Sequence, residues 1–439
     1  MGSLLVKDGT AVVNGVLLNL DVLIENGTIS KIGCCLENNG TEELDAAGLY
    51  VLPGLIDEHV HLREPGLTYK EDFGSGTSAA AAGGLTLVFD MPNTVPPIDS
   101  AERLIEKREA VRRKSHVDYG LYGLVRDTSD APEIIRMAKS GSIGFKSYMG
   151  PTTGNIPAPS HETLYSILNA LSEIDVPLVV HAEDEGLVKF FTSRANKNSS
   201  FAHLESRPYI CETFSVGELA SLSEYTGAKV HVAHVSSGRT LKIIEWAKTH
   251  GIRLTAEVTP HHLFLNDSIY SSAENFAKIN PPIRSGKDGE ALLKAAASDT
   301  ISTVASDHSP HTVEEKLGGS PPSGFPGLET ELPLMLDAVN AGKFGLADIV
   351  RLMSENVARL FGIYPRYGSL LPGSHGNITI VSLKLKTKIN AEKFYSKAKY
   401  SPFNGMELSG KVMYTVVGGD IVYDGEVHDD IIGKFVTRK

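Results

Sequence analysis

The stretch that decides the fold is residues 50–66, YVLPGLIDEHVHLREPG, an apolar run that ends in charged and polar residues. Segments of helical composition follow such runs, as in AERLIEKREAVRRK at residues 101–114. Apolar strands that alternate with helices are typical of a parallel sheet covered by helices. The pattern therefore predicts an α/β fold of the (β/α)8 TIM-barrel type. The other apolar, β-branched runs are residues 85–92, 117–125, 143–149, 177–184, 229–236, 253–260 and 302–311.

A doubly wound open sheet is the competing architecture. It would need a glycine-rich phosphate turn directly after an early strand. No GxxxxGK[ST] motif occurs, and the nearest dinucleotide-type match, GSGTSA at residues 74–79, has no strand immediately before it. We therefore favour the barrel.

The two ends of the chain have a different rhythm from the middle. Residues 3–52 consist of short apolar runs separated by turn signals such as Asn-Gly and Asp-Gly. The last part of the chain, with GNITIVSL and GKVMYTVVGGDIVYDGEV, returns to that style. We therefore predict a small β-sandwich domain built from both chain ends, residues 1–52 and 367–439. Residues 53–366 would form the barrel.

Composition and charge disfavour several classes of protein. The 439 residues include 42 Lys+Arg against 53 Asp+Glu, a net charge of −11. Nucleic-acid binders usually present a basic face, so a nucleic-acid partner is not expected. Cys34, Cys35 and Cys211 show no CxxC spacing, so we expect a reducing compartment and a cytoplasmic protein. No apolar stretch approaches the roughly 18 residues of a membrane span, so no membrane partner is expected either.

Histidines and other polar residues gather where the predicted barrel strands end. Catalytic groups of barrel enzymes lie at this edge, so side chains from separate strands can converge there. His59 and His61 are two residues apart in one strand, which places both side chains on the same face. One such histidine alone would as readily be a hydrogen-bonded core residue. Together the set indicates a metal site with the ligands His59, His61, His181, His234 and Asp307.

The donor types narrow the choice of metal. Imidazole and carboxylate without thiolate suit Zn²⁺, and also Mn, Fe or Co. His59 and His61 can hold one ion, and His181 and His234 can hold a second. Two ions about 3.5–4 Å apart are best held with a bridging anion.

A lysine in an apolar run is the candidate for that anion. Lys146 lies within GFKSYM, where burial would lower the pKa of its amine. A neutral amine can take up carbon dioxide to form a carbamate, whose two oxygens can bridge two ions. The alternative is a lysine paired with a buried carboxylate. We favour the carbamate because four histidines and an aspartate are predicted to converge nearby.

The other histidines have simpler interpretations. His231 lies three residues before His234 and should face the other side of its strand, as a packing residue. His261 and His262 would be structural residues or would support the site from behind the ligands, rather than bind metal themselves. The Gly/Pro-rich residues 312–327 follow the last apolar run, where an active-site loop would lie. Histidines in helix or loop contexts, expected to be exposed to solvent, are His116, His161, His203, His250, His375 and His428.

Six motifs resemble the amidohydrolase superfamily and, most closely, the class I dihydroorotase family. The resemblance runs from about Tyr50 to Arg366, and the split β-rich ends match the small domain of the superfamily. The motifs are His59-Val-His61-Leu-Arg63-Glu-Pro-Gly, Met91-Pro-Asn93-Thr, Gly144-Phe-Lys146, His181-Ala-Glu, Ala233-His234-Val-Ser-Ser and Ser306-Asp307-His308-Ser-Pro-His311.

The resemblance implies two zinc ions per subunit, joined by a carboxylated lysine. Some class I members lack this lysine and bind metal differently, so double occupancy is inferred from its presence here. The resemblance implies that His59, His61 and Asp307 bind the more buried ion. It implies that His181 and His234 bind the second ion, and that carboxylated Lys146 bridges the two.

The same resemblance implies a reaction. The family interconverts N-carbamoyl-L-aspartate and L-dihydroorotate plus water, a step of pyrimidine biosynthesis. Asp307 would take a proton from the attacking water and deliver it to the leaving ring nitrogen. Arg63, Asn93 and His311 would hold the substrate carboxylate, with Asn280 contributing more weakly. Arginine suits this role because its planar, charged group meets a carboxylate in two hydrogen bonds.

Two other functions stay open at this point. A hydantoinase or allantoinase would share the barrel, the metals and the carbamate. Its substrate carries no ring carboxylate, however, and so has no need of Arg63, Asn93 and His311. A catalytically inactive barrel kept as a scaffold should have lost metal ligands, and none is missing here. In each case we expect a homo-oligomer, such as a dimer.

Overall fold

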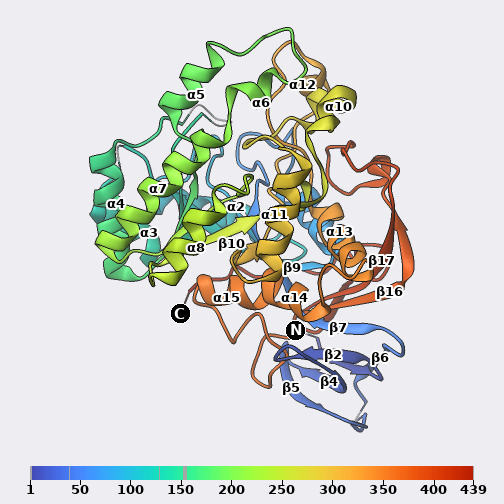
Figure 1. Cartoon of the computed structure of the whole chain (residues 1–439). Helices are drawn as coiled ribbons and strands as arrows, with labels where there is room; N and C mark the ends of the chain where they lie inside the picture. The colour runs from blue at the N-terminus through green and yellow to red at the C-terminus, as the bar shows by residue number, and fades with distance from the viewer. Residues whose placement is uncertain (1, 39, 128, 152–155, 439) are drawn as a thin grey trace.

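The middle of the chain forms a parallel eight-stranded sheet in this computed structural model (Figure 1). The structure describes residues 2–38, 40–127, 129–151 and 156–438. Neighbours in the sheet follow the chain order from β8 to β15, and the paired strands are parallel. The strands are β8 (Leu55–Val60), β9 (Leu85–Asp90), β10 (Asp118–Leu124), β11 (Gly144–Tyr148), β12 (Leu178–His181), β13 (Val230–Val232), β14 (Leu254–Val258) and β15 (Thr303–Val304).

The first and last strands of this sheet also meet. Val60, at the end of β8, forms a parallel bridge with His308, which follows β15. The backbone N–H of His61 donates to the carbonyl of His308 at 2.8 Å. These contacts close the barrel and bring the histidines of the first strand beside the segment that follows the last. Each strand lies within one of the eight apolar runs, so the predicted barrel is confirmed.

Helices surround the barrel (Figure 1). Local capping explains where several begin: Ser100 and Ser160 accept hydrogen bonds from backbone N–H groups in the first turns of α2 and α4. The helices are α1 (Phe73–Ala82), α2 (Ala101–Val111), α3 (Ala131–Lys139), α4 (His161–Ile174), α5 (Glu185–Thr192), α6 (Ala202–Ser206), α7 (Tyr209–Thr226), α8 (Leu241–Thr249), α9 (Pro260–Phe264), α10 (Tyr270–Ala277), α11 (Gly286–Ala297), α12 (Val313–Leu317), α13 (Leu328–Asn340), α14 (Leu346–Val350) and α15 (Asn356–Leu360), with the short turns η1 (Asp267–Ile269), η2 (Arg351–Glu355) and η3 (Ala391–Lys393).

Two smaller sheets contain the strands of the chain ends, and the second of them combines strands from both ends. One has the order β5-β4-β1-β6 and the other β18-β17-β16-β7-β2-β3. In the second sheet β7 pairs with β16 and with β2, so blue and red segments of Figure 1 lie side by side. This confirms the small β domain. The strands are β1 (Leu4–Lys7), β2 (Thr10–Val13), β3 (Val16–Asn19), β4 (Asp21–Glu25), β5 (Thr28–Gly33), β6 (Glu42–Asp45), β7 (Tyr50–Pro53), β16 (Ile378–Lys388), β17 (Glu407–Val417) and β18 (Asp420–Tyr423).

The barrel strands are buried on both faces. β8, β9, β10 and β11 are buried along their whole length, as expected of parallel strands that pack against helices on one side and against one another on the other. Phe89 and Tyr122 pack edge to face on Phe361, which follows α15. With this apolar packing in place, the buried polar side chains at the strand ends stand out. Among the described residues, no helix combines the length and apolar character needed to cross a membrane.

Candidate active site

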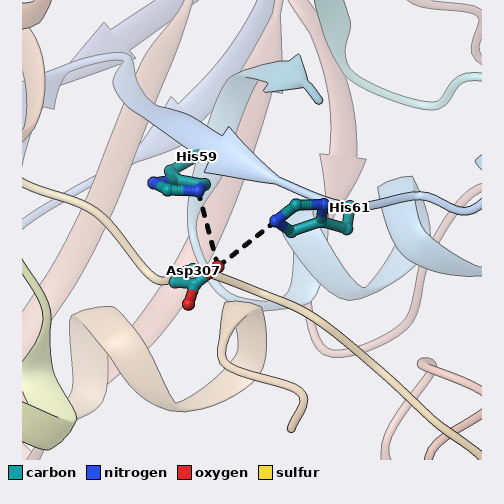
Figure 2. A group of neighbouring side chains, drawn as sticks. All are labelled: His59, His61 and Asp307. Carbon is teal, nitrogen blue, oxygen red and sulfur yellow. Dashed lines mark ion pairs between the residues drawn. The ribbon is translucent and has the colours of Figure 1, made fainter. Parts of the chain in front are cut away.

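Two histidines and an aspartate meet where the barrel closes (Figure 2). Oδ1 of Asp307 lies 3.5 Å from Nε2 of His59 and 3.3 Å from Nε2 of His61. One ligand atom from each residue lies within 4.8 Å of those of the other two. All three side chains are buried. The grouping predicted from the spacing of these residues is therefore present.

The remaining two predicted imidazoles lie beside this group. His181 ends β12 and His234 follows β13, with Nδ1 of the first 3.1 Å from Nε2 of the second. The ring centroids of His59 and His234 are 5.3 Å apart. Burial lowers the pKa of each of these histidines, and the nearby Lys146 adds to the effect. Neutral imidazole is the form that binds a metal ion.

Lys146 projects into the same group from β11. Its side chain is fully buried, and Nζ lies 3.4 Å from Nε2 of His59. Burial lowers the pKa of the amine to about 8, although Glu257 and Asp307 oppose that shift. Within the part of the chain that the structure describes, no ion pair joins this lysine to a carboxylate. The alternative of a simple buried ion pair is therefore not what the structure contains.

Hydrogen-bond partners fix which nitrogen of each imidazole faces the centre. Nδ1 of His59 contacts Oε1 of Glu257, which also accepts the backbone N–H of His234 at 2.9 Å. Nδ1 of His61 lies 2.7 Å from Oδ1 of Asn93. An acceptor at Nδ1 places the proton there and leaves the lone pair on Nε2, the atom that faces Asp307.

His181 is held in the opposite sense. Its Nε2 lies 3.0 Å from Oε2 of Glu183, which also forms an ion pair with Arg207. The lone pair therefore lies on Nδ1, the atom that faces His234. Burial alone would raise the pKa of Glu183, but Arg207 and His181 lower it to about 2, so this carboxylate is ionised. The donor set thus converges on one region, and its chemistry fits a divalent metal ion.

A small cavity of about 30 Å³ opens beside these ligands. Arg63 reaches it from the turn after β8, and its Nε donates to the carbonyl of Pro310 at 3.2 Å. Asn93 and Asn280 also line the cavity. Of the residues predicted to hold a substrate carboxylate, these three therefore share a wall with the metal ligands. The remaining lining residues are Tyr148, Ser309, Ser323 and Gly324.

His311 lies behind this wall. Its Nε2 is 3.4 Å from Nη2 of Arg63 and 3.1 Å from the carbonyl oxygen of Ser323, and its Nδ1 is 3.1 Å from Nζ of Lys70. Burial, with Arg63 and Lys70 nearby, holds the pKa of this histidine far below its usual range. The ring is therefore neutral, and it contacts Arg63 and Ser323 from behind the wall.

Comparison with known proteins agrees with this geometry. The amidohydrolase family matches residues 50–422. The chain belongs to the amidohydrolase family. Its relatives include the dihydroorotase of Methanothermobacter thermautotrophicus, 37% identical over 93% of this chain and 92% of that protein. The dihydroorotase of a Geobacter species is 36% identical over 96% of this chain and 99% of its own.

Solved structures that superpose on this chain include a hydantoinase and a dihydropyrimidinase. The L-hydantoinase of Arthrobacter aurescens superposes with a TM-score of 0.96 at 32% identity, covering 100% of both chains. A dihydropyrimidinase from Brevibacillus agri gives a TM-score of 0.92 at 27% identity over 100% of this chain and 99% of its own. This amidohydrolase therefore has dihydroorotases among its sequence relatives and hydantoinases among its structural neighbours.

Three residues of this amidohydrolase site have backbone strain. Arg63, His234 and Asp307 have φ angles of 61°, 37° and 45°. Residues other than glycine adopt positive φ only where the surrounding structure holds them, and such positions cluster at functional sites. Each of these residues lies just after a barrel strand, so the strain turns its side chain toward the cavity.

Sequence reasoning missed the acidic residues behind the ligands. Glu257 lies within β14 and touches both His59 and His231, whose Nε2 is 3.5 Å from its Oε2. Glu58, His231 and Glu257 form a second buried group whose ligand atoms lie within 4.8 Å of one another. A usable signal existed, because Glu257 is a charged residue inside the otherwise uncharged strand LTAEV.

Three histidines expected to be exposed are not, and one of them is the half-buried His375, whose ring stacks on Tyr367 with the centroids 5.0 Å apart. His116 is buried, and its backbone N–H donates to Thr77 at 3.0 Å. Nε2 of His203 lies 2.7 Å from the carbonyl of Ile279, and burial lowers the pKa of this histidine to about 3. The expectation failed at all three because helix and loop contexts do not report which neighbouring segment folds over them.

Proposed function

We propose that the chain is a dihydroorotase, which converts N-carbamoyl-L-aspartate reversibly to L-dihydroorotate and water in pyrimidine biosynthesis. The observation that carries this proposal is that Arg63 lines the same small cavity as the histidines and Asp307. A guanidinium there can meet a substrate carboxylate while the ring amide lies against the metal ligands. Dihydroorotases that match nearly the full chain support the choice.

The proposed cofactor is two zinc ions per subunit. The donor chemistry of the site supports it, since neutral imidazoles, a carboxylate and a buried lysine with lowered pKa converge there. A bound divalent metal would supply a Lewis acid that lowers the pKa of water and polarises an amide carbonyl. Carboxylated Lys146 would bridge the two sites. The residues proposed for the more buried ion are His59, His61 and Asp307, and those for the second are His181 and His234.

Asp307 is the proposed proton carrier of the reaction. Burial raises the pKa of its carboxyl group, although His59 and Lys146 oppose the shift. A carboxylate with a raised pKa takes a proton from water more readily, and as an acid it can then deliver that proton to the leaving ring nitrogen. Its Oδ1 faces both histidines, which leaves Oδ2 for the reacting groups.

Substrate binding is proposed for Arg63, Asn93, Asn280 and His311. Arg63 would bind the carboxylate, because guanidinium stays charged in proteins even when burial lowers its pKa. Asn93 and Asn280 line the cavity around it. Oδ1 of Asn93 contacts His61, so this residue joins the carboxylate end of the site to a metal ligand. His311 would support Arg63 from behind the wall.

A hydantoinase is the second candidate, because the superposition on the L-hydantoinase is close. Its substrate is a cyclic amide without a ring carboxylate, so it would leave Arg63 without a partner. An inactive scaffold would be expected to lack metal ligands, whereas all six predicted ligands are present. We also propose a homo-oligomer, such as a dimer, which size-exclusion chromatography with light scattering would test.

The deciding experiment is a comparison of substrates with zinc-loaded protein. We expect turnover of N-carbamoyl-L-aspartate and of L-dihydroorotate, with little turnover of hydantoin or allantoin. Zinc content would be measured on the same samples by elemental analysis. Faster turnover of hydantoin than of dihydroorotate would contradict the proposal and favour the second candidate.

A further inference from the structure

Residues 318–324 form a wall between two cavities. The catalytic cavity of about 30 Å³ is lined partly by Ser323 and Gly324. An outer cavity of about 900 Å³ is lined partly by Gly319 and Ser323. Ser323 lines both, so the segment separates them.

A buried lysine fastens this wall. Lys316, in α12, has no exposed surface. Its Nζ donates to the carbonyls of Lys278, Pro322 and Gly324 at 3.3, 3.0 and 2.9 Å. In the described ranges of the chain, no carboxylate forms an ion pair with it. Since burying an unpaired amine is costly, its hydrogen bonds to these carbonyls are what hold the side chain in place.

The two fastened carbonyls lie on either side of Ser323. The carbonyl oxygen of Ser323 itself is 3.1 Å from Nε2 of His311, and its Oγ donates to Oδ1 of Asn280 at 3.1 Å. The backbone N–H of Gly324 also donates to the carbonyl of Lys278 at 2.8 Å. Fixing residues 322 and 324 therefore fixes the position of Ser323, and with it both side chains that Ser323 contacts.

We propose that Lys316 is a positioning residue for substrate binding, because its amine fastens residues 322–324 against the catalytic cavity. Through Ser323 it holds His311, which contacts Arg63, and Asn280, which lines the catalytic cavity. Lys316 neither lines the catalytic cavity nor contacts a metal ligand, so it acts only through this wall. The inference rests on the proposed function, since the substrate roles of His311 and Asn280 belong to it.

The test compares Lys316→Met with the control Lys287→Met, which changes an exposed lysine of α11. We expect Lys316→Met to raise KM for N-carbamoyl-L-aspartate by about tenfold to a hundredfold, with kcat and zinc content little changed. The reason is that a loosened wall weakens binding but leaves the metal ligands in place. Lys316→Gln, whose amide can still donate to these carbonyls, should give an intermediate KM.

A second readout does not depend on turnover. Amide hydrogen exchange of residues 318–324, measured without substrate, should be faster in Lys316→Met than in wild type or Lys287→Met. Unchanged KM and unchanged exchange would overturn the proposal, as would a fall in kcat that follows loss of zinc. If Lys316→Met does not fold, Lys316→Gln carries the same comparison. Failure of the proposed function would be seen separately, as wild-type protein that does not turn over the substrate although Lys316 still governs exchange.

Discussion

At the scale of single residues, a side chain proposed to bind metal and one proposed to bind substrate differ in charge although they line the same cavity. His61 is neutral because burial, with Arg63 and Lys146 nearby, holds its pKa well below the usual range. Arg63, two residues further along, remains a cation. His61 thus presents a nitrogen lone pair and Arg63 a positive charge to the same cavity. A cyclic amide with a carboxylate needs both, the first to hold a metal ion and the second to bind the carboxylate.

Replacing Arg63 tests its proposed role in binding the substrate carboxylate. Arg63→Ala should raise KM for dihydroorotate by about tenfold to a hundredfold, because a charged hydrogen-bond partner of the carboxylate is lost. Zinc content should stay at the wild-type level, since no predicted metal ligand hydrogen-bonds to Arg63. Steady-state kinetics with dihydroorotate and with a neutral hydantoin would be compared. An equal loss with both substrates would show that Arg63 does not bind the carboxylate.

Replacing Lys146 tests its proposed role as the bridge between the two metal sites. Lys146→Ala removes the only proposed bridge between the two sites, so zinc per subunit should fall and kcat should fall with it. Short carboxylic acids such as acetate should restore part of both, because a carboxylate can take the place of the carbamate. Elemental analysis and activity against acetate concentration are the measurements. Full activity of the variant without added acid would remove the bridge from the mechanism.

At the scale of elements, α12 begins with a capped first turn and buries the amine of Lys316. Thr312 and Glu315 form a reciprocal capping box at its first turn. The helix thereby presents Lys316 inward, where burial, with Lys278 nearby, lowers the pKa of its amine to about 7. The segment that closes the cavity is therefore anchored by a group that titrates near neutral pH.

The stability of this anchor should depend on pH. The pKa of Lys316 is about 7 in the folded chain, below the usual lysine value of 10.5. Between these values the unfolded chain binds more protons, so stability relative to Lys316→Met should rise with pH. From pH 6.5 to 8.5 the gain should approach roughly 2 kcal/mol. Urea unfolding of both proteins at the two pH values measures it, and a difference independent of pH would contradict the burial of this charge.

At the scale of the whole molecule, the buried side chains of Asn377 and Asp118 join the C-terminal part of the chain to the barrel. Nδ2 of Asn377 donates to Oδ2 of Asp118, in β10, at 2.9 Å, and Oδ1 of Asn377 accepts the backbone N–H of Gly418 at 2.8 Å. Oδ1 of Asp118 accepts the backbone N–H of Lys434 at 2.7 Å. Both side chains are buried. This polar junction is one of the buried contacts that join the small β domain to the barrel.

Removing that junction should destabilise the protein without touching the site. Asn377→Ala leaves the carboxylate of Asp118 and the N–H of Gly418 short of a partner, which should cost about 1–3 kcal/mol. Denaturant unfolding measures the loss, and Asn198→Ala, an exposed control, should stay within about 0.5 kcal/mol of wild type. KM at a temperature where both proteins are folded should not change. A stability equal to wild type would show that the two parts are held together by other contacts.

Much of the architecture was predictable because it rests on local signals. Strands of a parallel barrel are buried on both faces, so they read as apolar runs, and β9, for example, lies inside the predicted run at residues 85–92. His59 and His61 could be assigned to one face because strand geometry alternates with a period of two. Polar residues at the ends of such runs indicated the catalytic edge. The exact residues of the division at 52/53 and 366/367 remain a prediction.

The barrel, the catalytic edge and the candidate ligands could therefore be predicted from the residues alone, because each rests on patterns within single segments of the chain. Which carboxylate faces which imidazole could be learned only from the folded chain. Glu257 lies 198 positions from His59, and no local pattern reports which side chains from strands that are not neighbours meet inside the barrel. The same holds for Lys316, whose partner Lys278 is 38 positions away. Buried polar groups must be satisfied wherever the fold brings them, and that location is a property of the closed barrel rather than of any segment.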